Sequence, residues 1–205
     1  QKGSYEDAAK LYEEILKGGN ESAAIYFNLG NAYYKLNNTP KSILNFERAK
    51  RLASADEDID FNLKLSNLKV VDKIEAIPQF FYKRWWHAFS QTFSLDNWAI
   101  ATVSFCWLTV IAIVFFILAR SILARKLFFF FGVITLVITL FSYFLAQHQN
   151  NQQTSTKEAI VFESNVYVKS SPDEKSVDLF ILHEGSKVQI LDEIGAWQKI
   201  KLANG

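Results

Sequence analysis

Histidine and cysteine side chains are the first places to look for metal binding or catalysis in this 205-residue chain. The pair His183-Glu184 begins like the zinc motif HExxH, but the second histidine of that motif is missing. His87 and His148 stand far from His183 in the sequence, and Cys106 is the only cysteine. Neither a disulfide within one chain nor a CxxC metal site is therefore possible. The sequence predicts no metal and no cofactor.

The acidic run Asp56-Glu57-Asp58 is the other candidate for cation binding. An EF-hand loop counted from Asp56 would need glycine where Phe61 stands and glutamate where Asn67 stands. We reject a calcium site for that reason. Since no Ser-His-Asp, Walker or Rossmann pattern occurs either, nothing in the sequence argues for catalysis, and we expect a protein that is not an enzyme.

The distribution of charge divides the chain into three blocks. Residues 97–146 contain three basic residues, no acidic residue and half of the 18 phenylalanines, whereas both flanking blocks are rich in charges of either sign. The formal net charge is only +1, which argues against a nucleic-acid partner. A simple water-soluble protein is already unexpected, because one block is almost entirely apolar.

Two uncharged stretches fill the middle block, residues 98–119 and 127–146. At about 1.5 Å per residue each reaches about 30 Å, the thickness of the hydrocarbon core of a bilayer. The alternative is a buried helical hairpin of a soluble protein, but a domain this small could hardly cover two helices that are apolar on every face. The sequence predicts a two-helix transmembrane hairpin over residues 97–146.

The connector between the two stretches, residues 120–126, holds Arg120, Arg125 and Lys126. A short basic loop is expected on the cytoplasmic side, which places both flanking blocks on the opposite, periplasmic side. Lys83-Arg84 before the first span is the weaker opposing signal. The prediction is a multi-pass protein of the bacterial inner membrane with its soluble domains facing the periplasm.

Residues 73–96 form an aromatic and basic segment next to the first span. Its centre, residues 80–89, mixes aromatic rings with basic side chains, which suits the headgroup layer of a membrane. The alternative is a helix end packed under the soluble domain. Pro78 is expected to break the chain between this segment and the preceding helix.

The N-terminal block, residues 1–72, carries a repeat with a period of 34 residues. Phe27-Asn28-Leu29 recurs as Phe61-Asn62-Leu63, and small and aromatic residues recur at the same shift. Helices are predicted at residues 4–17, 23–36, 40–53 and 57–72. The block resembles tetratricopeptide repeats, most closely in its middle copy. In the third copy Lys64 replaces the usual small residue, so the last helix resembles a terminal cap.

The concave face of such an array usually holds an extended peptide. By this resemblance, five polar residues would build the peptide-binding face, namely Asn28, Asn31, Tyr34, Lys35 and Asn62. Asparagine side chains there could clamp a peptide backbone or a carboxylate. The alternative is that they are ordinary solvated positions.

The C-terminal block begins after a polar linker, residues 147–156, which has no core-forming residue and is expected to be flexible. Alternating patterns then predict strands at residues 159–163, 166–169, 177–182, 187–191 and 197–202. The segments 165–172, 182–188 and 195–200 resemble a bacterial SH3 (SH3b) domain over residues 157–205. This resemblance implies a further strand beyond Gly205, so we expect an incomplete domain.

The order of these parts, with the Phe-Phe-Tyr-Lys-Arg-Trp-Trp edge at 80–86 and the Leu-His-Glu-Gly turn at 182–185, resembles the E-type proteins of the bacterial aerotolerance (Bat) operons. The resemblance implies protein partners from the same operon, namely membrane-anchored von Willebrand A-domain proteins and a MoxR-type AAA+ ATPase. It also implies a role in oxidative-stress tolerance or envelope maintenance. The expected fold is multidomain, with an α-helical tetratricopeptide solenoid, a transmembrane hairpin and a small all-β SH3-like barrel.

Three functions compete on the sequence alone. The first is a membrane-anchored scaffold whose repeats and SH3b domain bind protein partners, two weak sites that gain from effective concentration. The second is an envelope sensor whose SH3b domain binds cell-wall peptide, against which the expected flexible linker argues. An enzyme or transporter is disfavoured, because the two spans contain no charged residue.

Overall fold

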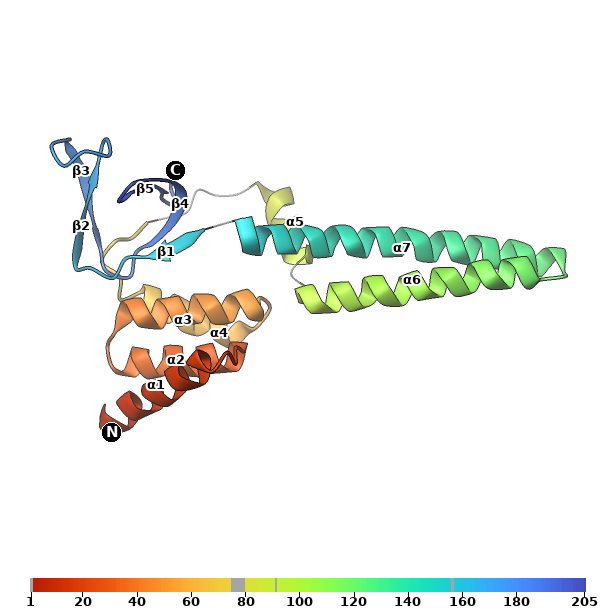
Figure 1. Ribbon diagram of the computed structural model, residues 1–205, viewed down its shortest axis with the longest axis horizontal. Coiled ribbons are helices and arrows are strands. Elements are labelled where there is room, and N and C mark those ends of the chain that lie inside the picture. The colour runs from red at the N-terminus through yellow and green to blue at the C-terminus, as the bar shows by residue number, and fades with distance from the viewer. Residues whose placement is uncertain (1, 75–79, 91, 156) are drawn as a thin grey trace. The chain divides into compact units, whose positions relative to one another are not determined.

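A computed structural model describes residues 2–74, 80–90, 92–155 and 157–205, and its ribbon is drawn in Figure 1. Within these ranges the chain forms seven helices and five strands. Two compact units emerge, one made of residues 1–80 with 156–205 and the other of residues 81–155. A mostly helical chain with two long apolar helices and a small antiparallel sheet region is thus confirmed. The expected break at Pro78 lies outside the described residues.

The helical block of the first unit contains α1 (Lys2–Lys17), α2 (Ala23–Lys35), α3 (Thr39–Leu52) and α4 (Glu57–Asn67). The first three helices agree with the predicted ranges to within two residues. Their ends are set locally. Gly19, with φ +82°, follows the end of α1, while Ser22 and Asn38 cap the starts of α2 and α3 by accepting backbone amides. Asp56 caps α4 in the same way.

The fourth helix is shorter than the prediction of residues 57–72, because α4 ends at Asn67. The chain then turns, with the Val70 amide donating to the Asn67 carbonyl over 3.2 Å. Val70 enters the buried core, and Asp72 binds the β region. These two contacts to residues distant in sequence take the place of the last helical turn.

Small residues let α2 and α3 approach closely. A Cβ at Gly30 would lie 2.8 Å from the ring of Phe46, which is fully buried. The Ser42 hydroxyl donates to the Gly30 carbonyl over 3.0 Å and lies 3.2 Å from the Ser66 hydroxyl of α4. Larger side chains at positions 30 and 42 would therefore push α2 and α3 apart.

The β region contains two antiparallel sheets. One has the order β1 (Glu158–Ile160), β4 (Lys187–Ile194), β5 (Trp197–Lys201), and the other pairs β2 (Asn165–Lys169) with β3 (Asp178–His183). All five predicted strands are present, although β1 ends three residues earlier than expected. Ile160 of β1 packs against the buried helical cluster of Ile43, Phe46, Leu63 and Val70. The helical block and the β region thus share one core.

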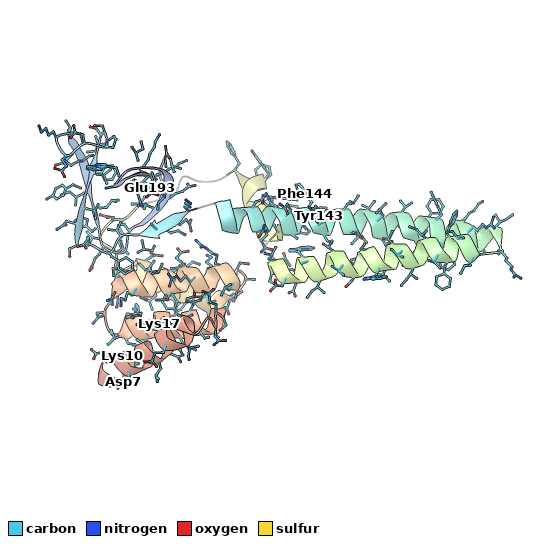
Figure 2. All side chains as sticks on the ribbon, viewed as in Figure 1. Asp7, Lys10, Lys17, Tyr143, Phe144 and Glu193 are labelled. Carbon is cyan, nitrogen blue, oxygen red and sulfur yellow. The ribbon has the colours of Figure 1, made fainter. Side chains whose placement is uncertain are left out.

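The second unit is built on an antiparallel hairpin of α6 (Leu95–Leu118) and α7 (Ile122–Ser155) (Figure 1). Both helices are long and apolar enough to cross a membrane, with mean hydropathy of 2.5 and 2.3 over their most apolar windows. Only 11% of each window is buried, so most of their apolar side chains face outward, as Figure 2 shows.

Two sequence predictions about α7 are wrong. Only residues 119–121 separate α6 from α7, so Arg125 and Lys126 of the expected connector lie in the first turns of a helix. Residues 147–155, expected to form a flexible linker, also continue α7. Polar composition suggested a coil, but glutamine is a good helix former, and a long apolar helix already supplies the costly nucleus.

The two long helices meet along a seam of small and hydroxyl-bearing residues. The Thr109 and Thr135 hydroxyls lie 3.0 Å apart, and both residues are buried. A Cβ at Gly132 would lie 3.4 Å from the Ala112 Cβ, which is ordinary van der Waals contact. Close approach of small residues with a few hydroxyl contacts is typical of helix pairs in lipid.

A further helix, α5 (Phe81–Ser90), packs against the open end of this hairpin. The contact is an aromatic cluster that consists of Trp86, Phe89, Phe93, Trp98, Phe141, Phe144 and His148. The Trp98 indole donates to the Ser90 carbonyl over 3.1 Å, which ties the end of α5 to α6. Residues 81–90 of the aromatic segment therefore form a helix with one face on the hairpin.

Candidate functional site

The five residues predicted to bind peptide lie on two neighbouring helices of the helical block. Asn28, Asn31, Tyr34 and Lys35 belong to α2, and Asn62 belongs to α4. The Lys69 ammonium, just after α4, lies 3.5 Å from the Tyr34 carbonyl and 3.1 Å from the Asn37 side-chain oxygen. The C-terminal end of α2 and the turn after α4 are therefore adjacent at Tyr34 and Lys69.

Contacts within the chain already occupy two of the five side chains. The Lys69 ammonium lies 3.7 Å from the centre of the Tyr34 ring, a cation–π contact. The Asn62 amide donates to the Asp58 carbonyl one turn earlier, over 2.8 Å. A ligand would have to displace Lys69 to stack on that face of Tyr34, and Asn62 keeps its side-chain oxygen and one N–H for a ligand.

The remaining three predicted residues are spaced as one helical stripe. Asn28, Asn31 and Lys35 stand three and four residues apart on α2. Within the described part of the chain, these three side chains make no hydrogen bond or ion pair. They form the α2 stripe, a set of amide groups and one ammonium able to meet a peptide backbone or a carboxylate. Peptide binding there stays a prediction.

A hollow of about 480 Å³ lies elsewhere on the helical block, at the C-terminal ends of α1 and α3. Burial and a hydrogen bond with Glu21 raise the pKa of Tyr26 in its wall, and the Arg48 guanidinium lies 5.6 Å from the Tyr26 ring. Its lining is mixed in character, namely Leu16, Lys17, Glu21, Tyr26, Arg48, Arg51 and Leu52. The predicted peptide-binding residues do not take part in it.

The sequence analysis did not predict one dense polar cluster of the described residues. Asp72, beyond the end of α4, accepts hydrogen bonds at one oxygen from the His183 amide (2.7 Å) and the Ser186 hydroxyl (2.6 Å). Its other oxygen lies 2.7 Å from His183 Nδ1. We call Asp72, His183 and Ser186 the β interlock, because they join the helical block to the β3–β4 turn.

The β interlock stabilises the ionised carboxylate. Burial alone would raise the pKa of Asp72, but the hydrogen bonds from His183 and Ser186 outweigh it and hold the pKa below its ordinary value. The constellation contains the residue types of a hydrolase triad. Its arrangement differs, because the serine hydroxyl donates to the aspartate and not to the imidazole that would have to deprotonate it. The geometry fits a structural link between the helical block and the β3–β4 turn.

Two further features make the junction specific. Lys187 of β4 lies 3.0 Å from Glu47 of α3 and 2.9 Å from Glu158 of β1. Burial would lower the pKa of Lys187, but the two carboxylates outweigh it and raise the pKa. Gly185 has φ +85°, and a Cβ there would lie 2.9 Å from Val70. Both the positive φ and the lack of space for a Cβ require glycine at this turn.

The β interlock was missed because its members stand 111 residues apart, on either side of the apolar block. His183 and Gly185 were recognised as part of a turn, but no periodicity links them to Asp72. For metals, no group of three or more His, Cys, Asp or Glu side chains among the described residues could hold an ion.

Comparison of the chain with protein-family models, with curated proteins and with solved structures found no match. The functional assignment therefore rests on the geometry of this chain and on the sequence resemblances.

Proposed function

We propose that this protein is a membrane-anchored scaffold that binds protein partners and is not an enzyme. The observation that carries the proposal is the pairing of two opposite surfaces in one chain. A folded unit of helices and strands displays the polar α2 stripe, while the hairpin of the other unit leaves nearly all of its apolar side chains exposed. Water suits the first surface and lipid suits the second.

We further propose that the helical block is a tetratricopeptide array and that the β region is an SH3b-like domain. The 34-residue period falls on pairs of antiparallel helices that approach through Gly30 and Ser42, which supports the first assignment. A three-stranded and a two-stranded antiparallel sheet are compatible with the second. On these grounds the chain is proposed to belong to the E-type proteins of aerotolerance operons.

The proposed location is the bacterial inner membrane with the folded unit in the periplasm. Residues 1–80 and 156–205 belong to one compact unit, so both must lie on the same side, as two crossings require. Arg120, Arg125 and Lys126 at the other end of the hairpin support a cytoplasmic placement for that end. Protease added to spheroplasts should cut the folded unit from outside, and protection of that unit would contradict the proposed orientation.

The proposed partner-binding surface is the α2 stripe with Asn62 of α4. The test replaces Asn28, Asn31 and Lys35 with alanine together. Asp7, Lys10 and Glu14 of α1 provide a matched control, since they are exposed and have the same three- and four-residue spacing; Figure 2 labels Asp7 and Lys10. Capture from detergent-solubilised membranes should lose the von Willebrand A-domain proteins and the MoxR-type ATPase with the first variant only. Equal recovery with both variants would sink the proposal.

A second candidate function, the envelope sensor, gains from one structural observation. The sequence argument against it was a flexible linker, but α7 continues as a helix through Ser155, and β1 begins at Glu158. A helix transmits motion better than a coil does. The test mixes the whole chain with purified cell wall and sediments the wall. If the chain stays in the supernatant, the sensor function is excluded.

A further inference from the structure

Helix α5 has two apolar faces, and within its own unit only one of them packs against described residues. The inner face carries Trp86, whose ring centre lies 6.3 Å from that of Phe144 and 6.1 Å from that of His148 on α7. Phe89 on the same face lies 6.1 Å from Phe141. This face holds α5 against the hairpin.

The outer face of α5 carries Phe81 and Trp85, one helical turn apart. Their exposed fractions are 79% and 78%, so the chain covers little of either side chain. The adjacent tryptophans 85 and 86 thus have opposite environments. Two large rings displayed on one turn of a short helix form an apolar surface that water disfavours.

The position of α5 along the hairpin indicates what covers this surface. Its contacts on α7 run from Phe141 to His148, the stretch where the apolar part of that helix gives way to glutamine and asparagine. The Gln149 amide donates to the Phe93 carbonyl over 3.4 Å, which keeps the α5–α6 connection at the same level. The outer face therefore lies where a bilayer around the hairpin would change from acyl chains to headgroups.

We propose that Phe81 and Trp85 insert into the headgroup–acyl boundary of the lipid bilayer, so that α5 lies along the membrane surface as a second anchor. Aromatic rings favour this layer, and Lys83 and Arg84, between them in the sequence, suit anionic headgroups. The inference rests on the proposed membrane hairpin. The occupant is lipid because the surface is continuous with helices whose exposed side chains are almost all apolar.

The single cysteine makes a direct test possible. A nitroxide on native Cys106, which is exposed on α6, reports on the span. In a C106S background, F81C and W85C place the label on the outer face, and L11C places it on the exposed side of α1 as a water reference. The full chain is reconstituted in vesicles of phosphatidylcholine and phosphatidylglycerol, and collision rates with oxygen and with a water-soluble nickel complex are measured.

The ratio of the oxygen collision rate to the nickel collision rate is expected to be intermediate at positions 81 and 85. It should lie below the ratio at position 106 and several-fold above the ratio at position 11. A ratio at 81 and 85 equal to that at 11, with 106 in lipid, overturns the inference but leaves the hairpin in the membrane. Low collision rates with both reagents at 81 and 85 also overturn it, because a protein would then cover the rings. A water-like ratio at 106 itself would refute the membrane hairpin on which the inference rests.

Discussion

The two junctions of this protein, the β interlock and the hairpin seam, hold secondary structure together by different means. The β interlock combines an apolar contact, Ile160 on the helical cluster, with an ionised carboxylate and a bridging lysine. Apart from Arg125, which donates to the Ala119 carbonyl at the turn, the described residues of the hairpin seam make no charged contact, and the seam relies on Thr109, Thr135 and close approach at Gly132. In water, burying apolar surface drives association and charges add specificity, whereas in lipid only packing and hydroxyl contacts remain.

Removing the largest fully buried side chain tests whether apolar burial dominates the stability of the first unit. Phe46→Ala should lower the free energy of unfolding of the helical block by about 3–5 kcal/mol, because Phe46 is fully buried and contacts both α2 and the β-facing cluster. Hydrogen-exchange mass spectrometry of the whole chain in detergent reads the amides of α2–α4 separately from the spans. Phe61→Ala is the control, since Phe61 is 65% exposed. Equal protection in both variants would contradict the described core.

Removing the carboxylate of the β interlock tests the polar part of the same junction. Asp72→Ala should lower the free energy of unfolding of the first unit by about 2–3 kcal/mol, because the Ser186 hydroxyl and the His183 amide lose a charged acceptor. The loss should appear as faster exchange of the amides in β3 and β4. Glu184→Ala, an exposed carboxylate in the same turn, is expected to change little. A large effect of Glu184→Ala on amide exchange would mean that the overall charge of the turn matters more than the hydrogen bonds of the β interlock.

Acid should weaken this junction through the same group. Because the folded-state pKa of Asp72 is lowered, its contribution is present above the pKa of an unfolded aspartate, about 3.9, and is lost as the pH falls through the folded value. The gap in β3–β4 protection between the unmodified chain and Asp72→Asn should therefore narrow below about pH 4. A gap that stays constant down to about pH 2 would show that the charge of Asp72 contributes nothing.

Substitution of a polar residue in the hairpin seam should change the free energy of unfolding least. Thr135→Val removes the hydroxyl contact with Thr109 and is expected to cost about 0.6 kcal/mol, the usual size of such contacts in a bilayer. Unfolding of the reconstituted chain with increasing SDS, followed by helix content, measures this change. Ser104→Ala removes an exposed hydroxyl from α6 and serves as the control. If Thr135→Val lowered the free energy of unfolding more than Asp72→Ala does, the hairpin seam would depend more on its polar contact than the β interlock depends on its carboxylate.

Local sequence signals predicted the individual elements well. Caps at Ser22, Asn38 and Asp56, and the glycines after α1, fix helix ends through contacts two or three residues away, so they can be read from sequence. The apolar block gave two long helices for a similarly local reason. The end of α4 could not be predicted, because Val70 and Asp72 respond to strands that lie more than a hundred residues later.

The candidate site was predicted only in part. The repeat placed Asn28, Asn31 and Lys35 together on α2, because helical spacing fixes which residues share a face. It could not foresee that Lys69 would cover the Tyr34 ring, since that contact depends on the turn after α4. The sequence also treated residues 157–205 as separate from the helical block, whereas the two belong to one compact unit in which Ile160 joins the helical core.

The sharing of one core between the two ends of the chain also sets an order of events during synthesis. The helices of the first unit leave the ribosome before both apolar helices, and His183 follows Asp72 by 111 residues. At typical elongation rates this gap lasts on the order of ten seconds. Throughout that interval Ile43 and Val70 have no strand to cover them, so the newborn helices need protection from aggregation until translation of the last strands is complete.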